Sequence, residues 1–371
     1  MKVIEIMDNL ALAGGVNSFV YDLCAALKSI NADVTLIAIM KNYGASNETV
    51  QQLKKKGIDV VCIGAANKKE AILKYIPKLR REILRISNGE QTVCNLHLKL
   101  SVLMGSIATI GCSKIKCVET YHSRYSKYWL ENFILQSRIK KYIACSESAN
   151  REMKKRFTVK KSKIITIPNG VDCELIKKSK ANPSDTTITA ISAGRFTEQK
   201  NFQITTKAFS SLCSDRIRYT IYGDGELKDE IISNKDNNNY ISICTPLDRF
   251  DLLRQVSKSN IVVMPSLWEG LSIFLLEAMA LGKPLMLSDV DSFRWVMSEK
   301  KLEHNETWRL CKWGFLVSNS SVEGYISSLE YFANHPELEK TMSKEVEKIS
   351  KRYDINTTAK SYLKQYSKLF E

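Results

Sequence analysis

The chain has 371 residues, of which 44% are hydrophobic and 26% are charged, and its formal net charge is +15. A chain of this length exceeds one ordinary core and indicates two domains, while the balance of apolar and charged residues excludes an intrinsically disordered protein. Ten cysteines occur with no C-x-x-C pair and no His/Cys cluster at zinc spacing, which favours free thiols in a reducing cytoplasm over a disulfide framework or a metal site.

Strand-like apolar runs alternate with helical patterns along the chain. In the first half the expected strands are residues 3–7, 34–39, 60–63, 93–96, 116–121, 142–145 and 164–167. The polar stretch Lys177 to Thr187 then predicts a linker. In the second half the expected strands are residues 189–193, 218–222, 240–244, 261–264, 285–288 and 315–318. Repeated β-α units of this kind predict parallel sheets covered by helices on both faces.

The alternation predicts an α/β fold of two doubly wound, Rossmann-like domains that face a central cleft. The first domain is expected over residues 1–175 and the second over residues 186–354. A final amphipathic helix at about 355–371 can pack back on either domain, and we assign it to the first. Loops at the carboxyl ends of the strands are expected to line the cleft.

Almost all of the net charge belongs to the N-terminal half. Residues 1–172 hold 28 Lys and Arg against 14 Asp and Glu, a net of +14, whereas residues 173–371 hold 27 against 26, a net of +1. The basic stretches 68–85 and 151–163 fit either a solvated helix face or a surface that attracts anionic lipid head groups or a phosphorylated acceptor. Nucleic acid is not favoured, because no nucleic-acid-binding signature accompanies the charge.

The most informative stretch of the sequence is 265–284. It follows a buried strand and predicts a tight turn at Glu269-Gly270 and then a helix over 273–281. Glu277 lies about one turn into that helix. The free N–H groups and positive dipole end of such a helix can bind an anion, while the two carboxylates can hold hydroxyl groups. This combination suits a nucleotide-diphosphate sugar.

A pair of cations follows the first strand of the second domain. Gly194-Arg195 and Lys200 precede a helix that is expected to begin near Asn201. Arg195 can fork onto phosphate oxygens, and Lys200 adds a compact charge. Cations held there would stabilise the charge that builds on a departing diphosphate. The alternative interpretation is a pair of ordinary surface charges.

Glycines mark the ends of two further strands. Gly14-Gly15 lies between a strand and a helix, where bare backbone and free N–H groups can meet a ligand, or where the loop is merely flexible. Gly223 and Gly225, with one residue between them, form either a plain turn or a close approach to a nucleotide; no third glycine completes a dinucleotide fingerprint.

Other polar residues stand at strand ends in the first domain. His122 follows an expected strand and should emerge into the cleft, although a lone histidine is also often structural. Asn169, within Pro168–Asp172, belongs to a tight turn or to an interdomain contact. The segment Cys145–Ser148 can cap the following helix.

In this order these motifs resemble the retaining glycosyltransferases of family four, which have the GT-B fold. The motifs are Gly14-Gly15, Thr120-Tyr-His122, Cys145-Ser-Glu147, Pro168-Asn-Gly-Val-Asp172, Gly194-Arg195 with Lys200, Gly223-Asp-Gly225 and the pair Glu269/Glu277. The glutamate pair is the most specific of them. Two segments are similar to those of bacterial capsule, exopolysaccharide and O-antigen transferases: Ser266-Leu-Trp-Glu-Gly-Leu-Ser272 and Gly194-Arg-Phe-Thr-Glu-Gln-Lys-Asn201.

The resemblance implies a role for each matching residue. The implied catalytic residues are His122, Arg195, Lys200 and Glu269. The implied donor-binding residues are Gly14, Gly15, Asn169, Gly194, Gly223, Gly225, Gly270, Leu271, Ser272, Ile273 and Glu277. Arg195 and Lys200 would hold the diphosphate, Glu269 the donor sugar, and Glu277 the ribose diol. His122 would approach the transferred sugar or the acceptor. The resemblance also implies no metal and no other cofactor.

The sequence departs from the family pattern at three places. Thr245-Pro246 stands where relatives often have a glycine near the nucleotide base, so the base contact is open. Asn201 follows Lys200 where glycine is common, and Ser272 occupies a position that varies among small residues. None of the three removes a charge that the mechanism requires.

The resulting hypothesis is a cytoplasmic enzyme that transfers a sugar from a nucleotide donor, a UDP-sugar, to a lipid-linked or cell-surface glycan acceptor. The N-terminus is not a signal peptide, and no apolar run approaches the roughly 18 residues of a membrane span. The basic half would bind the inner face of the membrane. Two alternatives remain: a glycoside hydrolase that uses Glu269 and Glu277 as acid and base, and a non-catalytic basic binding module.

Overall fold

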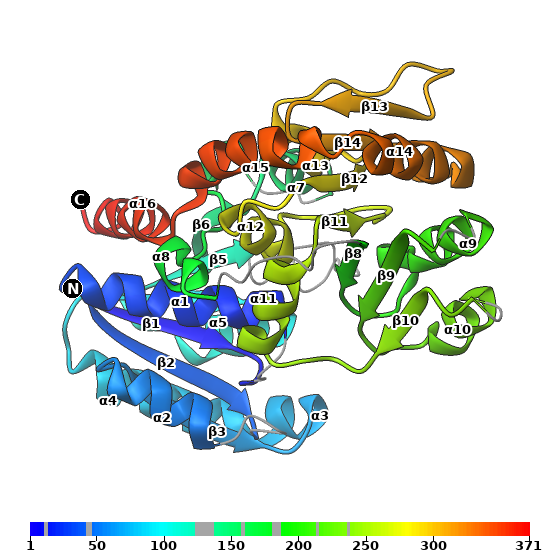
Figure 1. Ribbon diagram of the computed structural model, residues 1–371. Coiled ribbons are helices and arrows are strands. Elements are labelled where there is room, and N and C mark those ends of the chain that lie inside the picture. Colours follow the sequence, from blue (N-terminus) through cyan, green and yellow to red (C-terminus); the bar gives the residue numbers. More distant parts are fainter. Residues whose placement is uncertain are drawn as a thin grey trace. The chain divides into compact units, whose positions relative to one another are not determined.

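The computed structural model of the chain describes residues 1–10, 14–41, 47–122, 137–156, 160–179, 187–212, 215–235 and 238–371. These residues form two compact units (Figure 1). Unit 1 comprises Met1–Gly170 and Asp354–Glu371, and unit 2 comprises Val171–Tyr353. Each unit contains a largely parallel sheet with helices between its strands. The predicted α/β fold with two Rossmann-like domains is therefore confirmed, and the cleft stays a prediction.

Unit 1 is built on a sheet whose described strands run in the order β3-β2-β1-β4-β5-β6-β7, with every neighbouring pair parallel. The strands are β1 (Lys2–Met7), β2 (Asp33–Met40), β3 (Asp59–Ala65), β4 (Thr92–His97), β5 (Ile115–Tyr121), β6 (Ile139–Ala144) and β7 (Ile164–Thr166). The helices are α1 (Gly15–Ser29), α2 (Asn47–Lys55), α3 (Lys68–Glu70), a π-helical turn (Ala71–Tyr75), α4 (Ile76–Ser87), α5 (Leu98–Ala108), α7 (Glu147–Arg156), a 3-10 turn (Lys161–Lys163) and α16 (Ile355–Ser367).

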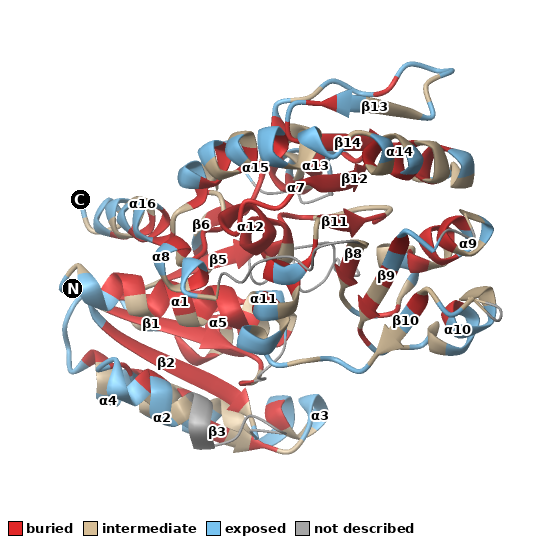
Figure 2. Ribbon diagram, in the orientation of Figure 1, coloured by how far each residue is buried: buried red, intermediate tan, exposed pale blue. Residues whose placement is uncertain are grey.

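The middle strands of unit 1 are buried along most of their length, as Figure 2 shows for β1 and β2. Burial on both faces is typical of a parallel sheet covered by helices, and it explains why these strands read as continuous apolar runs. Strand order reverses at β1, which lies between β2 and β4. In open α/β sheets, ligands bind at the carboxyl ends of strands beside such a switch point.

Unit 2 repeats this plan with a described strand order of β10-β9-β8-β11-β12-β14-β13. The strands are β8 (Ile188–Ala193), β9 (Ile217–Tyr222), β10 (Ile241–Cys244), β11 (Ile261–Met264), β12 (Leu285–Ser288), β13 (Trp308–Cys311) and β14 (Gly314–Val317). The helices are α8 (Cys173–Lys177), a 3-10 turn (Glu198–Lys200), α9 (Phe202–Leu212), α10 (Lys228–Lys235), α11 (Arg249–Lys258), α12 (Ile273–Ala280), α13 (Asp291–Met297), α14 (Val322–Asn334), α15 (Glu337–Ser350) and a 3-10 turn (Lys351–Tyr353).

The sequence did not predict β13, which pairs antiparallel with β14 at the edge of the sheet of unit 2. The switch point of this sheet lies at β8, between β9 and β11. The loops after β8 and β11 carry Arg195, Lys200 and Glu269.

The boundaries of the two units can be compared with the sequence. The predicted first domain ends at residue 175, whereas the structure separates the units between Gly170 and Val171. Lys177 was predicted to begin the linker, but in the structure it is the last residue of α8. Residues 180–186 of the predicted linker lie outside the described residues. Helix α16 packs against α1 within unit 1, and Figure 1 shows the two side by side.

None of the helices within the described ranges combines the length and the apolar character that are needed to cross a bilayer.

Candidate active site

The two loops at the switch point of unit 2 are joined by an ion pair. Lys200 Nζ, from the loop after β8, lies 2.6 Å from Glu269 Oε1, from the loop after β11. Both side chains are largely shielded, with exposed fractions of 19% for Lys200 and 7% for Glu269. Such a charge-assisted hydrogen bond is short and strong when water is partly excluded. The structure thus brings together two of the four residues that the sequence predicts to be catalytic.

Polar neighbours fix the position of Glu269. Ser266 Oγ donates to Glu269 Oε1 at 2.8 Å. Gln199 Nε2 donates to the carbonyl of Trp268 at 3.0 Å, and the N–H of Leu267 donates to the carbonyl of Gln199 at 2.8 Å. The loops after β8 and β11 therefore hold each other through backbone as well as side chains. Ser266 and Gln199 were not predicted as site residues.

Asn201 occupies a turn whose backbone conformation also suits glycine. Its backbone is left-handed, with φ of 51°, a conformation that glycine and asparagine adopt most readily. The side-chain amide donates to the carbonyls of Pro265 and Asn319, at 3.2 and 3.0 Å. Asparagine therefore replaces glycine at this turn and ties it to the loop after β11.

The glycines predicted to approach a nucleotide have a packing role in unit 2. A Cβ on Gly223 would lie 2.1 Å from the carbonyl oxygen of Gly194, and one on Gly225 would lie 2.5 Å from that of Phe196. The N–H of Phe196 donates to the carbonyl of Asp224 at 2.9 Å, and its side chain is fully buried. Close contact between the loops after β8 and β9 thus requires these glycines, whether or not a ligand is bound.

Arg195 lies in the same loop as Lys200 and is exposed. Phe196, the next residue, is buried and anchors the loop, so Arg195 is displayed on a fixed backbone. A guanidinium on such a support can meet two phosphate oxygens at once.

Helix α12 begins as the sequence predicts, and Ser272 is its N-cap. The Ser272 hydroxyl accepts a hydrogen bond from the N–H of Leu275 at 3.4 Å. The four residues 270–273, whose N–H groups were predicted to meet phosphates, are all buried. Free N–H groups in the first turn of a helix favour an anion. This is the local geometry that the donor-binding prediction requires, and the contact with the donor stays a prediction.

Glu277 is engaged by a residue that the sequence analysis missed. Arg249 Nε, at the first position of α11, lies 2.6 Å from Glu277 Oε1. The exposed fractions of the two side chains are 15% and 7%. Glu269 and Glu277 therefore each have their own basic partner. No spacing rule connects residue 249 to residue 277, and only the packing of α11 on α12 brings them together.

A chain of buried hydrogen bonds lies in unit 1 and includes the predicted His122. His122 follows β5, and its Nε2 lies 2.9 Å from Nδ1 of His97, the last residue of β4. Nε2 of His97 lies 2.6 Å from Oε2 of Glu5 in β1. The exposed fractions are 7% for His122 and zero for the other two. Burial and the neighbouring His97 hold the pKa of His122 well below its usual range.

Sequence reasoning missed Glu5 and His97. A signal existed, because polar residues interrupt otherwise apolar strands at Glu5, Asn95 and His97. Their meaning depends on β1 pairing with β4, which sets Glu5 opposite Asn95. The strand order of a parallel sheet is not a local property of the sequence, so the signal could not be used.

The other predicted residues of unit 1 are Gly14, Gly15 and Asn169. Gly14 caps α1 with φ of 131°, and both glycines are exposed. Asn169 is buried. Ser146 accepts a hydrogen bond from the N–H of Ala149 at 3.1 Å, so the predicted helix cap after β6 is confirmed.

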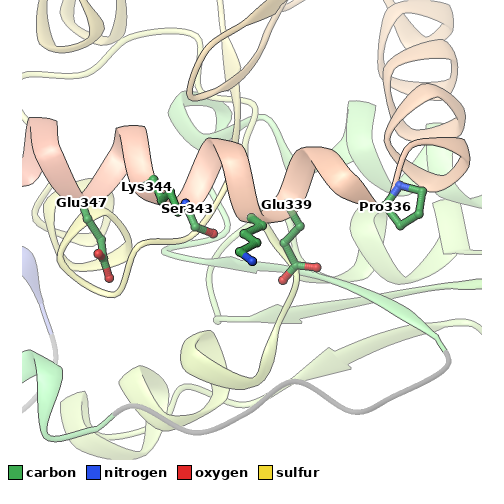
Figure 3. Close-up of a pocket in the computed structure, with 6 residues that line it drawn as sticks. Pro336, Glu339, Ser343, Lys344 and Glu347 are labelled. Carbon is green, nitrogen blue, oxygen red and sulfur yellow. The ribbon is translucent and has the colours of Figure 1, made fainter.

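In the described part of the chain, no group of three His, Cys, Asp or Glu side chains gathers as a metal site would require. A hollow of about 390 Å³ lies along α15, and Figure 3 draws the side chains that line it. Its lining residues are Pro336, Glu339, Lys340, Ser343, Lys344 and Glu347. None of the site residues predicted from the sequence is among these six.

Solved structures with the same architecture define the class of this fold. A glycosyltransferase from Rickettsia africae has a TM-score of 0.77 at 17% identity and covers 100% of this chain and 98% of its own. HepE of Anabaena, crystallised with UDP-glucose, has a TM-score of 0.78 at 14% identity and covers 99% and 100%. At these identities the likeness shows the fold, which is that of the GT-B glycosyltransferases.

Family models match both halves of the chain. Residues 13–175 match Glycosyltransferase Family 4, and residues 174–349 match Glycosyl transferases group 1. The chain is thus a glycosyltransferase whose N-terminal and C-terminal halves each match a glycosyltransferase family model. An uncharacterized glycosyltransferase of Haemophilus influenzae is 25% identical over 94% of each chain. An Escherichia coli relative, UDP-Gal:alpha-D-GlcNAc-diphosphoundecaprenol alpha-1,3-galactosyltransferase, is 27% identical over 54% of this chain and 53% of its own.

Proposed function

We propose that the chain transfers a sugar from a UDP-sugar to a lipid-linked or cell-surface glycan acceptor in polysaccharide biosynthesis, with retention of anomeric configuration. The Lys200–Glu269 ion pair at the switch point of unit 2 is the observation that carries this proposal. It sets a cation and a carboxylate side by side, which suits a phosphate next to a sugar. Arg195, exposed in the same loop, adds the second cation.

The ion pair leaves both partners able to bind substrate. An ammonium group has three N–H donors, and Lys200 uses one of them on Glu269, so two remain for diphosphate oxygens. Oε1 of Glu269 accepts from Lys200 and Ser266, whereas Oε2 accepts only a long hydrogen bond of 3.5 Å from Gln199 Nε2 among the described residues, so Oε2 has a lone pair that can accept from a sugar hydroxyl. As the glycosidic bond breaks, negative charge grows on the diphosphate, and prearranged cations stabilise that charge most in the transition state.

The choice of UDP is supported by proteins similar to this chain. The name of the E. coli relative specifies UDP-Gal as donor and a diphosphoundecaprenol-linked acceptor. The Anabaena structure contains UDP-glucose. We therefore propose that the donor of this enzyme carries a uridine nucleotide and that its acceptor is lipid-linked. Metal independence is also part of it, because Arg195 and Lys200 can supply the positive charge that a divalent cation would otherwise contribute.

A panel of nucleotide sugars tests the proposal. The protein is incubated with UDP-, GDP-, ADP- and CDP-sugars, with and without EDTA, and nucleotide release is measured. We expect slow release of UDP alone, unchanged by EDTA, and faster release when a polyprenyl-diphosphate sugar is added. Release of another nucleotide would show that the donor is not a UDP-sugar. Loss of activity in EDTA would show that the enzyme needs a metal ion. The anomeric coupling constant of the product, by NMR, tests retention.

A membrane surface is proposed on unit 1, where charge and exposed apolar side chains coincide. Ile72, Leu73 and Leu84 are exposed by 38%, 70% and 44%. They stand on the helical stretch 68–87 among exposed Lys69, Lys74, Arg81 and Arg85. A helix with cations and exposed aliphatic side chains favours the interface of an anionic membrane. We accordingly propose a cytoplasmic protein held peripherally at the inner face of the membrane.

Vesicle flotation tests this surface. We expect wild-type protein to float with anionic vesicles at low salt, to bind neutral vesicles weakly, and to detach at high salt. A Leu73→Ser, Lys69→Glu, Lys74→Glu variant should lose binding. The matched control, Ile232→Ser with Lys340→Glu and Lys348→Glu, changes exposed residues of unit 2 by the same charge and should still float. Equal binding to neutral and anionic vesicles would contradict the proposal.

The two alternatives are less well supported. A glycoside hydrolase needs its two carboxyl groups to act as a pair across one bond, whereas Glu269 and Glu277 are each held by a different cation. A basic binding module without catalysis would not need the polar network around Glu269. Calorimetric titration with UDP and with an oligonucleotide distinguishes them, because only a transferase should prefer UDP.

A further inference from the structure

We propose that Glu5 and His97 are positioning residues that hold His122 in its Nε2–H tautomer, so that Nδ1 of His122 accepts a hydrogen bond from a hydroxyl group of the sugar substrate. This inference rests on the proposed function, because it gives one predicted residue of unit 1 a defined chemical role.

The chain of hydrogen bonds that leads to His122 starts at Glu5, whose carboxylate accepts from three donors. Tyr366 Oη in α16 donates to Oε1 at 3.0 Å. Asn95 Nδ2 donates to Oε2 at 2.8 Å, and His97 Nε2 lies 2.6 Å from the same oxygen. The orientation of the Asn95 amide is fixed, because its Oδ1 accepts from the hydroxyl of Thr120 at 2.9 Å. A carboxylate surrounded in this way is an acceptor only.

With neutral imidazole rings, the direction of the following hydrogen bonds is determined. A neutral His97 that donates to Glu5 carries its proton on Nε2 and has a lone pair on Nδ1. That lone pair accepts from Nε2–H of His122 across the 2.9 Å contact. His122 consequently has a lone pair on Nδ1, the far end of the chain.

Nδ1 of His122 is buried and has no hydrogen-bond partner among the described residues. A buried acceptor without a donor is costly to maintain, so such an atom calls for a functional explanation. A hydroxyl group is a neutral donor of suitable size, and sugars carry several. The pKa of His122, lowered by burial and by His97, keeps this lone pair unprotonated at neutral pH.

The surroundings place this atom where substrates bind in such folds. His97 ends β4 and His122 follows β5, next to the switch point of the sheet of unit 1. Phe19, from the helix that Gly14 caps, packs edge-on against the His122 ring with centroids 5.4 Å apart and restricts its rotation. The titratable groups that interact with Glu5 or contact His122 include Cys24, Cys94, Cys145, Tyr362 and Tyr366.

Nitrogen NMR on protein labelled with ¹⁵N-histidine tests the tautomers directly. The chain has four histidines, so four pairs of ring signals are expected. His97→Gln and His122→Asn variants assign two of them. We expect both residues to be neutral Nε2–H tautomers at pH 7 and the Nδ1 signal of His122 to shift when UDP-glucose and a glycan acceptor are added. An Nδ1–H or doubly protonated His122 in wild-type protein would overturn the proposal.

A Glu5→Leu variant tests the positioning role. Leucine cannot accept from His97 Nε2, and Asn95 Nδ2, 3.2 Å from that nitrogen, can donate to it instead. His97 then carries its proton on Nδ1 and donates to His122 Nε2, which places the proton of His122 on Nδ1. We expect this tautomer by NMR and a fall in kcat of about tenfold or more, because a misplaced tautomer removes the acceptor. UDP affinity should stay within about twofold, since UDP binding is assigned to unit 2.

Glu119→Leu is the matched control, because it makes the same change at a buried glutamate of β5 that lies outside the chain of hydrogen bonds. Its kcat should be unchanged. A Glu5→Leu enzyme with wild-type kcat would overturn the proposal. The tautomer measurement needs no turnover, so absence of any sugar transfer by the wild type would instead count against the proposed function.

Discussion

Lys200 Nζ and Glu269 Oε1 lie 2.6 Å apart and join the loops after β8 and β11. These strands are neighbours at the point where the strand order of unit 2 reverses. A cation and an anion are therefore held together where a phosphate and a sugar hydroxyl would arrive. Such prearrangement is effective in catalysis because the groups need no reorganisation when charge develops.

Removing the charge of Glu269 should impair transfer more than it impairs binding of the nucleotide. We expect Glu269→Gln to lower kcat by roughly 100-fold, because an amide holds neither Lys200 nor the donor sugar as the carboxylate does. UDP affinity, measured by calorimetry, should change little. The control is Glu198→Gln, an exposed residue in the same loop as Lys200. Undiminished turnover of Glu269→Gln would remove Glu269 from the active site.

Substitution of Gly223 should destabilise unit 2. A Cβ there would lie 2.1 Å from the carbonyl oxygen of Gly194, so the loops must separate. We expect Gly223→Ala to lower the free energy of unfolding by about 3 kcal/mol in urea melts, a typical cost of overpacking. Glu226→Ala, at a nearby exposed position, should leave it unchanged. If Gly223→Ala leaves the free energy of unfolding unchanged, the contact between the two loops is loose.

The Arg249–Glu277 pair should couple stability to nucleotide binding. Arg249→Ala leaves the largely buried Glu277 without this cation and should lower the free energy of unfolding by about 2 kcal/mol. It should also weaken UDP binding, because the carboxylate predicted to hold the ribose is no longer oriented. Arg254→Ala removes an exposed arginine from the same helix and serves as the control. If the two variants bind UDP equally, Arg249 has no part in orienting Glu277.

His122 should make stability depend on pH in the mildly acidic range. Its pKa is lowered in the folded state, so the unfolded chain binds more protons once the pH falls below about 6.5. Stability should therefore decrease as pH falls through this range, by at most about 1.4 kcal/mol per pH unit from this group. Urea melts from pH 7.5 to 5 should show a shallower dependence for His122→Asn. His304→Gln, at an exposed histidine, should match wild type.

Local chemistry explains what could be predicted from the sequence. Buried strands such as β11 are continuous apolar runs, and the N-cap Ser272 and the turn at Glu269 are encoded within a few residues. The edge strand β13 escaped prediction because only the last of its four residues is buried and because it includes an arginine. Two-sided burial, not strand propensity, gives central strands such as β11 and β12 their signal.

Long-range pairing explains what was missed. Glu5 and His97 are 92 positions apart, and Arg249 and Glu277 are 28 apart. Each pair depends on which elements become neighbours, and propensities do not encode this. Lys200 and Glu269 were found separately, as a cation in a loop and a carboxylate at a turn. Their contact became visible only when the order of β8 and β11 was known.

The central claim is that unit 2 grips a diphosphate through Arg195 and Lys200. Calorimetric titration of wild-type protein with UDP and with uridine tests it most directly. We expect UDP to bind at least about 100-fold more tightly than uridine, since two charge-assisted contacts to phosphate contribute about 3 kcal/mol or more. That advantage should disappear in Arg195→Ala/Lys200→Ala. Equal affinity for UDP and uridine in wild-type protein, or a double variant that still prefers UDP, would contradict the account.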